Sequence, residues 1–100
     1  RIFGVLMIAS FAESNTESIF HGYSVKGIPL EIQNIARRKL RMLNNSTSLQ
    51  DLKVPPSNKL EKLKGSWKNF YSIRVNIRWR IVFVWKNNQS FEVSLLDYHR

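Results

Sequence analysis

The last third of the sequence combines arginines on strand-forming, apolar-rich segments with a chain end that carries proton-transfer groups. Residues 72–83 read Ser-Ile-Arg-Val-Asn-Ile-Arg-Trp-Arg-Ile-Val-Phe, and Asp97, Tyr98 and His99 follow near the end. Guanidinium groups stabilise negative charge but do not act as bases, because they keep their proton. Carboxyl, phenol and imidazole groups can transfer protons. The combination suggests a site for a phosphodiester.

Metal-free cleavage of RNA needs only groups of these kinds. The ribose 2′-hydroxyl is an internal nucleophile, so a protein must align it with the phosphate, neutralise developing charge and manage two protons. Arg74 and Arg80 suit charge stabilisation, and Lys64 lies where the chain enters the expected sheet. Any one of these residues alone is more often an exposed residue without a catalytic role. The inference of a catalytic site therefore depends on their grouping.

Other chemistries find little support in the sequence. His21 and His99 are far apart, and no histidine or carboxylate cluster has the spacing of metal ligands. Neither a nucleophile elbow nor a glycine-rich phosphate loop is present. We therefore expect no metal and no cofactor.

Composition indicates one compact, strongly basic domain. The 100 residues are 43% hydrophobic and 12% aromatic, which is enough to bury a modest core. Sixteen Lys and Arg against seven Asp and Glu give a net charge of +9, which attracts polyanions. Charge alone does not choose between DNA, RNA, an acidic protein and a membrane, and a solvated basic surface would explain it equally well.

The absence of cysteine excludes a disulfide framework, a thiolate zinc site and a cysteine nucleophile. Since no secretory signal pattern is visible, we expect a cytoplasmic protein. The apolar opening, residues 1–6, is far too short to span a bilayer, so no membrane association is expected. Because Met7 suits a start residue, we expect a single domain over 7–100, with 1–6 as upstream or cloning-derived sequence.

Two helices are predicted in the first half of the chain. Residues 8–11 suggest a short strand, and Ser14 or Asn15 is expected to cap a brief helix that ends before Gly22. A second helix is expected to begin at Pro29 and to end at Asn44 and Asn45. Its apolar face comprises Ile28, Ile32, Ile35, Ala36, Leu40 and Leu43. Arg37, Arg38, Lys39 and Arg41 lie on or near its opposite side, where a solvated basic face competes with a specific binding surface.

An antiparallel sheet is predicted from Lys59 onward, after an extended loop at 54–58. A three-residue loop at 76–78 would place Arg74 across from Arg80, a like-charged pair that suggests an anion between them. An odd-length loop after Asn87 would pair the apolar residues of the last two strands with each other. The expected pairs are Ile81 with Leu95, Phe83 with Val93, Trp85 with Phe91, and Arg78 with Tyr98.

Taken together, these motifs resemble those of the HigB toxins of bacterial toxin–antitoxin modules, within the RelE/ParE superfamily. The matching elements are Asn58-Lys59-Leu60-Glu61-Lys62-Leu63-Lys64-Gly65, Tyr71-Ser72-Ile73-Arg74-Val75-Asn76, Trp79-Arg80-Ile81-Val82-Phe83 and Asp97-Tyr98-His99, with 37–43 similar to the family's second helix. The similarity covers nearly everything from Met7. It implies an α+β, RelE-like microbial-ribonuclease fold, in which two helices pack on a curved antiparallel sheet.

The resemblance also implies an activity, namely ribosome-dependent cleavage of mRNA in the decoding site, and it assigns roles to residues. The catalytic set would be Lys64, Arg80, Asp97, Tyr98 and His99. Arg74 would contact phosphate, and the substrate-binding set would further include Asn76, Arg78 and Glu61. Glu61 stands where some HigB proteins carry a histidine, so either another group acts as base, or cleavage is slower, or Glu61 itself takes part.

The partners implied by the resemblance are a HigA-like helix-turn-helix antitoxin, the ribosome and mRNA, in the bacterial cytoplasm. Operator DNA would be bound only through the antitoxin complex. Phosphate contacts would position the protein on ribosomal RNA without setting a codon preference. The residues expected to dock on the ribosome are Arg37, Arg38, Lys39, Arg41, Lys62 and Lys68.

Two other functions remain open at this point. A gyrase inhibitor like those of the ParE branch would share the fold without cleaving RNA. The grouping of Lys64, Arg80, Tyr98 and His99 argues against it. A non-catalytic basic module that binds RNA or DNA would explain the charge without any chemistry, and it would tolerate loss of Tyr98 and His99.

Overall fold

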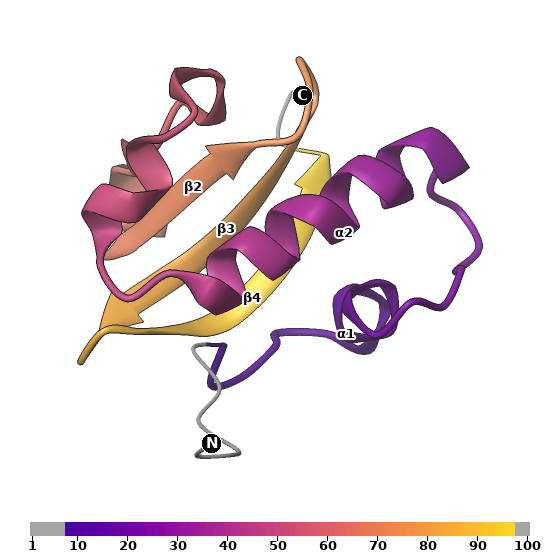
Figure 1. Ribbon diagram of the computed structural model, residues 1–100, viewed down its shortest axis with the longest axis horizontal. Helices are drawn as coiled ribbons and strands as arrows, with labels where there is room; N and C mark the ends of the chain where they lie inside the picture. Colours follow the sequence, from indigo (N-terminus) through magenta and orange to yellow (C-terminus); the bar gives the residue numbers. More distant parts are fainter. Residues whose placement is uncertain (1–7, 98–100) are drawn as a thin grey trace.

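The computed structural model describes residues 8–97, in which two helices precede a four-stranded antiparallel sheet (Figure 1). The helices are α1 (Ser14–Phe20) and α2 (Leu30–Asn45). The strands β1 (Glu61–Lys62), β2 (Phe70–Arg74), β3 (Trp79–Lys86) and β4 (Gln89–Asp97) lie in the order β1-β2-β3-β4. Short 3-10 turns occupy Leu49–Lys53, Pro56–Asn58 and Gly65–Trp67. The predicted α+β class is therefore confirmed.

Helix α1 is short and is fixed at its first turn. Glu13 caps it, because one carboxylate oxygen accepts hydrogen bonds from both the amide and the hydroxyl of Thr16, each at 2.6 Å. The cap is thus Glu13, and the expectation of Ser14 or Asn15 is wrong. The Thr16 hydroxyl in turn accepts a bond from the amide of Leu95 on β4 (3.0 Å). This bond ties the helix to the last strand.

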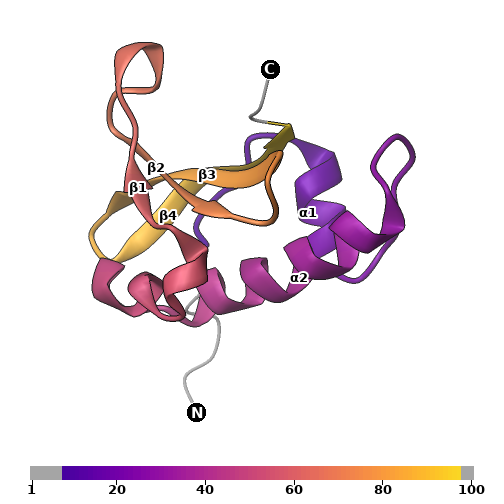
Figure 2. The same ribbon diagram turned by 90° about the horizontal axis from the view of Figure 1, so that it is seen from above.

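Helix α2 packs its apolar face against one face of the sheet (Figure 2). Ile32, Ala36, Leu40 and Leu43 are buried, as their spacing predicts, and the helix follows Pro29 and ends at Asn45. Gln33 is also buried, which the apolar pattern did not indicate. Its side-chain amide donates to the carbonyls of Val25 and Ile28 and accepts from the amide of Val25, so its polar atoms are satisfied.

The core lies between α2 and this face of the sheet. Its largest fully buried side chain is Phe83, and Ile73 and Ile81 are buried beside it. The residues expected to form a first strand, 8–11, instead make two isolated parallel bridges to β4, from Ile8 and from Phe11. The loop expected at 54–58 closes into a 3-10 turn over its last three residues.

The β2–β3 hairpin has the predicted register. Arg74 pairs with Arg80 and Ile73 with Ile81. In the turn, the Asn76 side-chain oxygen accepts hydrogen bonds from the amides of Arg78 and Trp79, both at 2.8 Å. This side chain therefore shapes the loop that sets the two arginines opposite each other.

The β3–β4 hairpin follows the prediction at one end only. Its turn has two residues, Asn87 and Asn88, at φ 54° and 61°, whereas an odd loop was expected. As a result Trp85 pairs with Ser90, and the expected pair with Phe91 is wrong. An extra residue on β4 then forms a bulge near Glu92, at φ 53°, which shifts the register by one. Beyond the bulge Ile81 faces Leu95, as predicted, while the expected pair of Phe83 with Val93 is absent from the register.

Candidate active site

Arg80 is the best-positioned cation of the predicted site. Its side chain is only 13% exposed. Its Nε donates to the hydroxyl of Ser72, and one terminal nitrogen donates to the backbone carbonyl of Lys59, each at 2.7 Å. Because these bonds come from β2 and from the segment before β1, the guanidinium plane is fixed from two directions.

Glu61 lies beside Arg80. One carboxylate oxygen of Glu61 is 3.7 Å from a terminal nitrogen of Arg80, and the glutamate side chain is 56% exposed. Glu61 reaches this place because β1 pairs it with Ser72, the residue that also accepts from Arg80. The sheet therefore brings together a fixed cation and a solvent-accessible acceptor, which are the two kinds of group that phosphodiester cleavage requires.

Arg74 adds a second positive charge to the site. It stands directly across from Arg80 in the β2–β3 pair and is half-buried. Within residues 8–97, no carboxylate forms an ion pair with Arg74. Arg74 and Arg80 thus place two positive charges opposite each other, an arrangement that favours a bound anion.

Arg78, in the β2–β3 turn, forms an ion pair with Asp97 at the end of β4. Two nitrogens of Arg78 donate to the two carboxylate oxygens of Asp97. This hydrogen bonding, and then the carboxylate charge, raises the pKa of Arg78 above its usual value. Asp97 pairs with Trp79 and not with Arg80, so strand alternation directs its side chain to the face opposite Arg80. The described residues therefore do not bring Asp97 together with Arg80.

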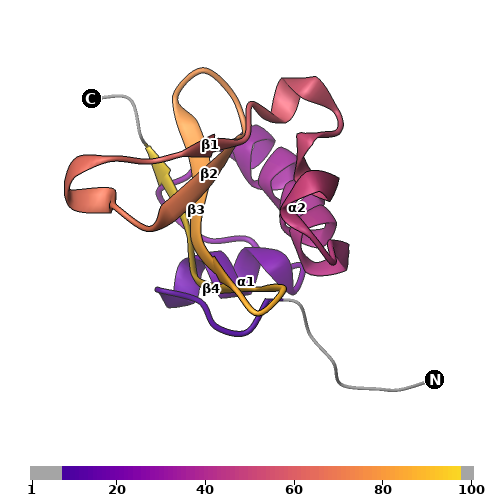
Figure 3. The ribbon, with the colours of Figure 1, turned by 90° about the vertical axis from the view of Figure 1, so that its left-hand side faces the viewer.

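Lys64 follows β1 in the sequence. The segment between β1 and β2 extends beyond the sheet (Figure 3). Lys64 precedes the 3-10 turn Gly65–Trp67, and its side chain is exposed. Its ammonium group makes no hydrogen bond or ion pair with another described residue. The structure thus places it on the β1 side of the sheet, while its catalytic role stays a prediction. Tyr98 and His99 lie outside the described residues.

The residues predicted to dock on the ribosome fall into two groups. Arg37 and Lys39 are used within the fold: Arg37 donates to the carbonyls of Ile19 (2.7 Å) and Tyr23 (3.2 Å), and Lys39 donates to the side chain of Asn58 (2.5 Å). Burial, and then the charge of Arg38, lowers the pKa of Lys39. The exposed members are Arg38, Arg41, Lys62 and Lys68.

Sequence reasoning missed Asn58 as a supporting residue of the site. Its side chain is fully buried and donates to the carbonyls of Leu52 (3.1 Å) and Val54 (3.3 Å). Its neighbour Lys59 adopts a left-handed backbone, at φ 49°, and offers Arg80 its carbonyl. The Pro-Pro sequence before Asn58 signalled a loop, but no local signal indicated a buried asparagine.

Residues 8–97 hold no cluster of three or more His, Asp or Glu side chains that could bind a metal ion. In the same range, none of the helices has the length and the apolar character needed to cross a bilayer.

Comparisons with known proteins identify the family of the chain and relatives of its fold. Residues 9–99 match the family model described as the RelE-like toxin of the type II toxin–antitoxin system HigB. The chain is 38% identical to Toxin HigB-1 of Vibrio cholerae over 73 residues, which cover 73% of this chain and 76% of that protein. It is 28% identical to Endoribonuclease HigB of Proteus vulgaris, over 93% of this chain and 100% of the relative. In the YoeB–YefM complex from Staphylococcus aureus, a chain covered to 98% superimposes on 93% of this one, with a TM-score of 0.58 and 19% identity.

Proposed function

Because this chain belongs to the HigB family of RelE-like toxins of type II toxin–antitoxin systems, we propose that it is an endoribonuclease that cuts translated mRNA in the ribosomal A site. The relative from Proteus vulgaris carries the name of an endoribonuclease. The observation that carries the proposal is the guanidinium of Arg80, held by Ser72 and Lys59 across from Arg74 and beside Glu61.

In the proposed reaction the 2′-oxygen of the ribose attacks the adjacent phosphorus, and the 5′-oxygen of the next nucleotide leaves. A 2′,3′-cyclic phosphate and a free 5′-hydroxyl result. Arg80 and Arg74 stabilise the additional negative charge on the phosphoryl oxygens, and Lys64 adds a third cation from the β1 side. This needs neither a metal nor a cofactor.

Two protons must move in this reaction, one from the 2′-hydroxyl and one to the leaving oxygen. Glu61 is the acceptor that lies next to Arg80, and it fits the first transfer. Tyr98 and His99 are proposed for the second. Asp97 is proposed to act indirectly. Its ion pair with Arg78 fixes the end of β4, and Tyr98 and His99 directly follow that end in the sequence. Asn76 and Arg78 stay proposed substrate contacts, although both also hold the turn.

The ribosome enters the proposal through the charge distribution. A net charge of +9 and the exposed cations of α2 and of the β1–β2 segment suit a cavity walled by RNA. Such a nuclease requires an inhibitor in its own cell, and we propose a HigA-like helix-turn-helix antitoxin that brings operator DNA to the complex. The cytoplasm of a bacterium is the compartment that this proposal requires.

Primer extension on an mRNA translated by purified ribosomes tests the proposal, beside the same mRNA without ribosomes. We expect cuts within codons that require ribosomes. Arg80→Lys keeps the charge but loses the planar fork that bonds Ser72 and Lys59, so cleavage should fall about 100-fold. Urea unfolding of the variant controls for loss of the fold. Lys53→Ala removes an exposed cation outside the proposed site and should cut at the normal rate.

Other outcomes of this experiment would contradict the proposal. Equal cutting with and without ribosomes would make the protein a simple ribonuclease. Intact mRNA, together with inhibited DNA supercoiling, would favour gyrase as the target. An Arg80→Lys variant that is fully folded and fully active would remove Arg80 from the chemistry.

A further inference from the structure

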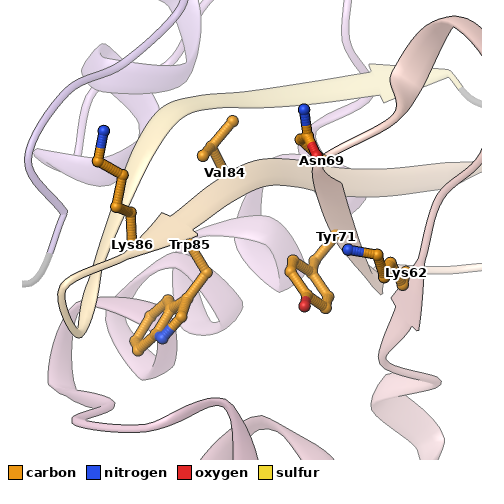
Figure 4. Close-up of a pocket in the computed structure, with 6 residues that line it drawn as sticks. All are labelled: Lys62, Asn69, Tyr71, Val84, Trp85 and Lys86. Atoms are coloured by element: carbon orange, nitrogen blue, oxygen red, sulfur yellow. The ribbon is translucent and has the colours of Figure 1, made fainter.

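A hollow of about 380 Å³ opens beside the end of β3 (Figure 4). None of the described residues that are proposed for catalysis lines it. Only one of its members, Lys62, belongs to the residues expected to dock on RNA. The lining residues are Lys62, Asn69, Tyr71, Val84, Trp85 and Lys86.

The hollow exists because β2 is shorter than β3. Phe70 and Val84 form the last pair between these strands, whereas Trp85 and Lys86 continue with partners on β4 alone. Asn69 has a left-handed backbone, at φ 80°, which turns the chain out of the sheet just before it would reach Trp85. The edge of β3 is therefore left open over its final residues.

The lining combines flat rings with positive charge. Tyr71 and Trp85 are half-buried and lie on one side of β3, while Val84, Lys86 and Asn69 lie on the other (Figure 4). The ammonium group of Lys62 stands 5.2 Å from the centre of the Tyr71 ring. Lys62 and Lys86 are both exposed, and none of the described lining residues carries a carboxylate. Both rings also contact Phe83 of the core. The hollow can thus offer a ligand the outer parts of two rings, two cations and one amide.

We propose that this hollow binds one unpaired nucleotide of the RNA strand that the protein cuts, with the base against Tyr71 and Trp85 and the phosphate at Lys62 and Lys86. Aromatic side chains beside lysines are the usual means of holding single-stranded RNA, because every base presents a flat face. The volume lies within the range of pockets that hold small molecules. An acidic peptide would use the lysines but would leave the rings without a matching partner.

The position of β1 connects the hollow with the Arg80 site. Glu61 and Lys62 are neighbours in this strand, and their side chains alternate between its two faces. Glu61 reaches toward Arg80, while Lys62 reaches toward Tyr71. An RNA strand that crosses β1, at the edge of the sheet, can therefore contact both the Arg80 site and the hollow. The choice of the cut strand as ligand rests on the proposed function.

Binding to the ribosome-free protein tests the inference. Adenosine monophosphate is titrated against ¹⁵N-labelled protein, and the indole signals of Trp67, Trp79 and Trp85 are followed by NMR. We expect a saturable shift of the Trp85 signal alone, with weaker effects from adenosine and from inorganic phosphate. Lys86→Ala should weaken binding about fivefold. Lys26→Ala, which removes an exposed lysine from the α1–α2 loop, is the matched control and should bind normally.

A second titration, with a non-cleavable 2′-O-methyl oligonucleotide, tests the assignment to the cut strand. Its affinity should also fall in Lys86→Ala. An unchanged oligonucleotide affinity would overturn this assignment in favour of another RNA. An unmoved Trp85 signal, a phosphate effect equal to that of the nucleotide, or displacement by an acidic peptide at lower concentration would overturn the nucleotide site itself. Neither titration involves ribosomes or cleavage, so its failure is distinguishable from failure of the proposed nuclease.

Discussion

Asn58 directly precedes Lys59, whose backbone carbonyl accepts a hydrogen bond from Arg80. It joins the carbonyls of Leu52 and Val54 to the ammonium group of Lys39, and the next residue supplies the carbonyl that fixes Arg80. Removing a buried side chain with several partners leaves polar groups unsatisfied. A single substitution at Asn58 therefore affects both the stability of the fold and the position of the proposed catalytic cation.

We expect Asn58→Ala to lower the free energy of unfolding by about 3 kcal/mol, because the two carbonyls and Lys39 lose their partner in a buried place. Urea unfolding followed by circular dichroism measures this change. Asn45→Ala, at the exposed end of α2, is the control and should change the same quantity by less than about 0.5 kcal/mol. Equal effects of the two substitutions would show that the Asn58 hydrogen bonds add little.

Individual side chains also show where reasoning from sequence stops. Helical spacing predicted Arg37 and Lys39 on or near the polar side of α2, whereas both are half-buried and bonded within the fold. It could not show that Arg37 bonds a carbonyl 18 residues away, or that Lys39 bonds a side chain 19 residues away. A long side chain can bend back over the helix surface, and its partner is decided by the tertiary fold. The facing arginines were predictable, because one short loop fixes their register.

At the scale of elements, the strand pairing of the β3–β4 hairpin was predicted correctly only beyond the bulge, and the predicted loop was not the whole cause of that pairing. Apolar pairing required Ile81 to face Leu95, and it does. The structure has a two-residue turn and a bulge on β4 in place of the expected odd-length loop. The extra residue of the bulge shifts the register by one, so the pairing beyond it is the one that an odd-length loop would give. A bulge carries no strong sequence signal when its left-handed residue is Glu92 and not glycine. The sequence could therefore predict the face of each strand better than the position of the irregularity.

The turn itself provides a test. Asn87 and Asn88 both have positive φ, as a type I′ turn requires, and asparagine followed by glycine is the preferred sequence for this turn. We expect Asn88→Gly to raise the free energy of unfolding by about 0.5 kcal/mol, since glycine adopts this conformation without steric cost. Asn88→Val should lower it by at least about 1 kcal/mol. Thermal or urea unfolding distinguishes the two, and a valine variant as stable as the glycine variant would contradict the assigned turn.

The 3-10 turn Leu49–Lys53 gives a pH-dependent prediction. A carboxylate oxygen of Asp51 accepts from the amide of Thr47 at 2.9 Å, and this bond is the main cause that lowers the pKa of Asp51 below its ordinary value of 3.8. The folded state therefore favours the carboxylate. Its contribution to stability is complete above the ordinary pKa and is lost as the pH falls through the lower folded value.

We accordingly expect the wild type to exceed Asp51→Asn in stability near neutral pH, with a difference that shrinks as the pH falls below 3.8. Urea unfolding of both proteins at a series of pH values measures this difference. A difference that stays constant down to about pH 2 would show that the charge of Asp51 contributes nothing to the fold.

At the scale of the whole molecule, some positively charged side chains bond other parts of the fold, and others are exposed to solvent. Arg37 and Lys39 hold segments of the chain together, and Arg78 is paired with Asp97. The net charge of +9 therefore overstates the number of cations that can meet RNA. On α2, Arg38 and Arg41 are exposed. The orientation of the protein on the ribosome should depend on these exposed residues, more than on the total field.

The corresponding prediction compares two double charge reversals. Arg38→Glu with Arg41→Glu changes the net charge from +9 to +5, and so does Lys26→Glu with Lys53→Glu, because each reversal subtracts two charges. We expect the α2 pair to lower ribosome-dependent cleavage near 0.15 M salt far more than the control pair does. It should also flatten the dependence of binding on salt, by roughly 0.7 to 0.9 in the log–log slope for each phosphate that the protein no longer neutralises. The contrary outcome is that the two double variants show the same fall in cleavage and the same salt dependence of binding. In that case α2 is not a docking face, and the positive charge acts only through its long-range field. A fall confined to the α2 pair would indicate that this helix docks on ribosomal RNA.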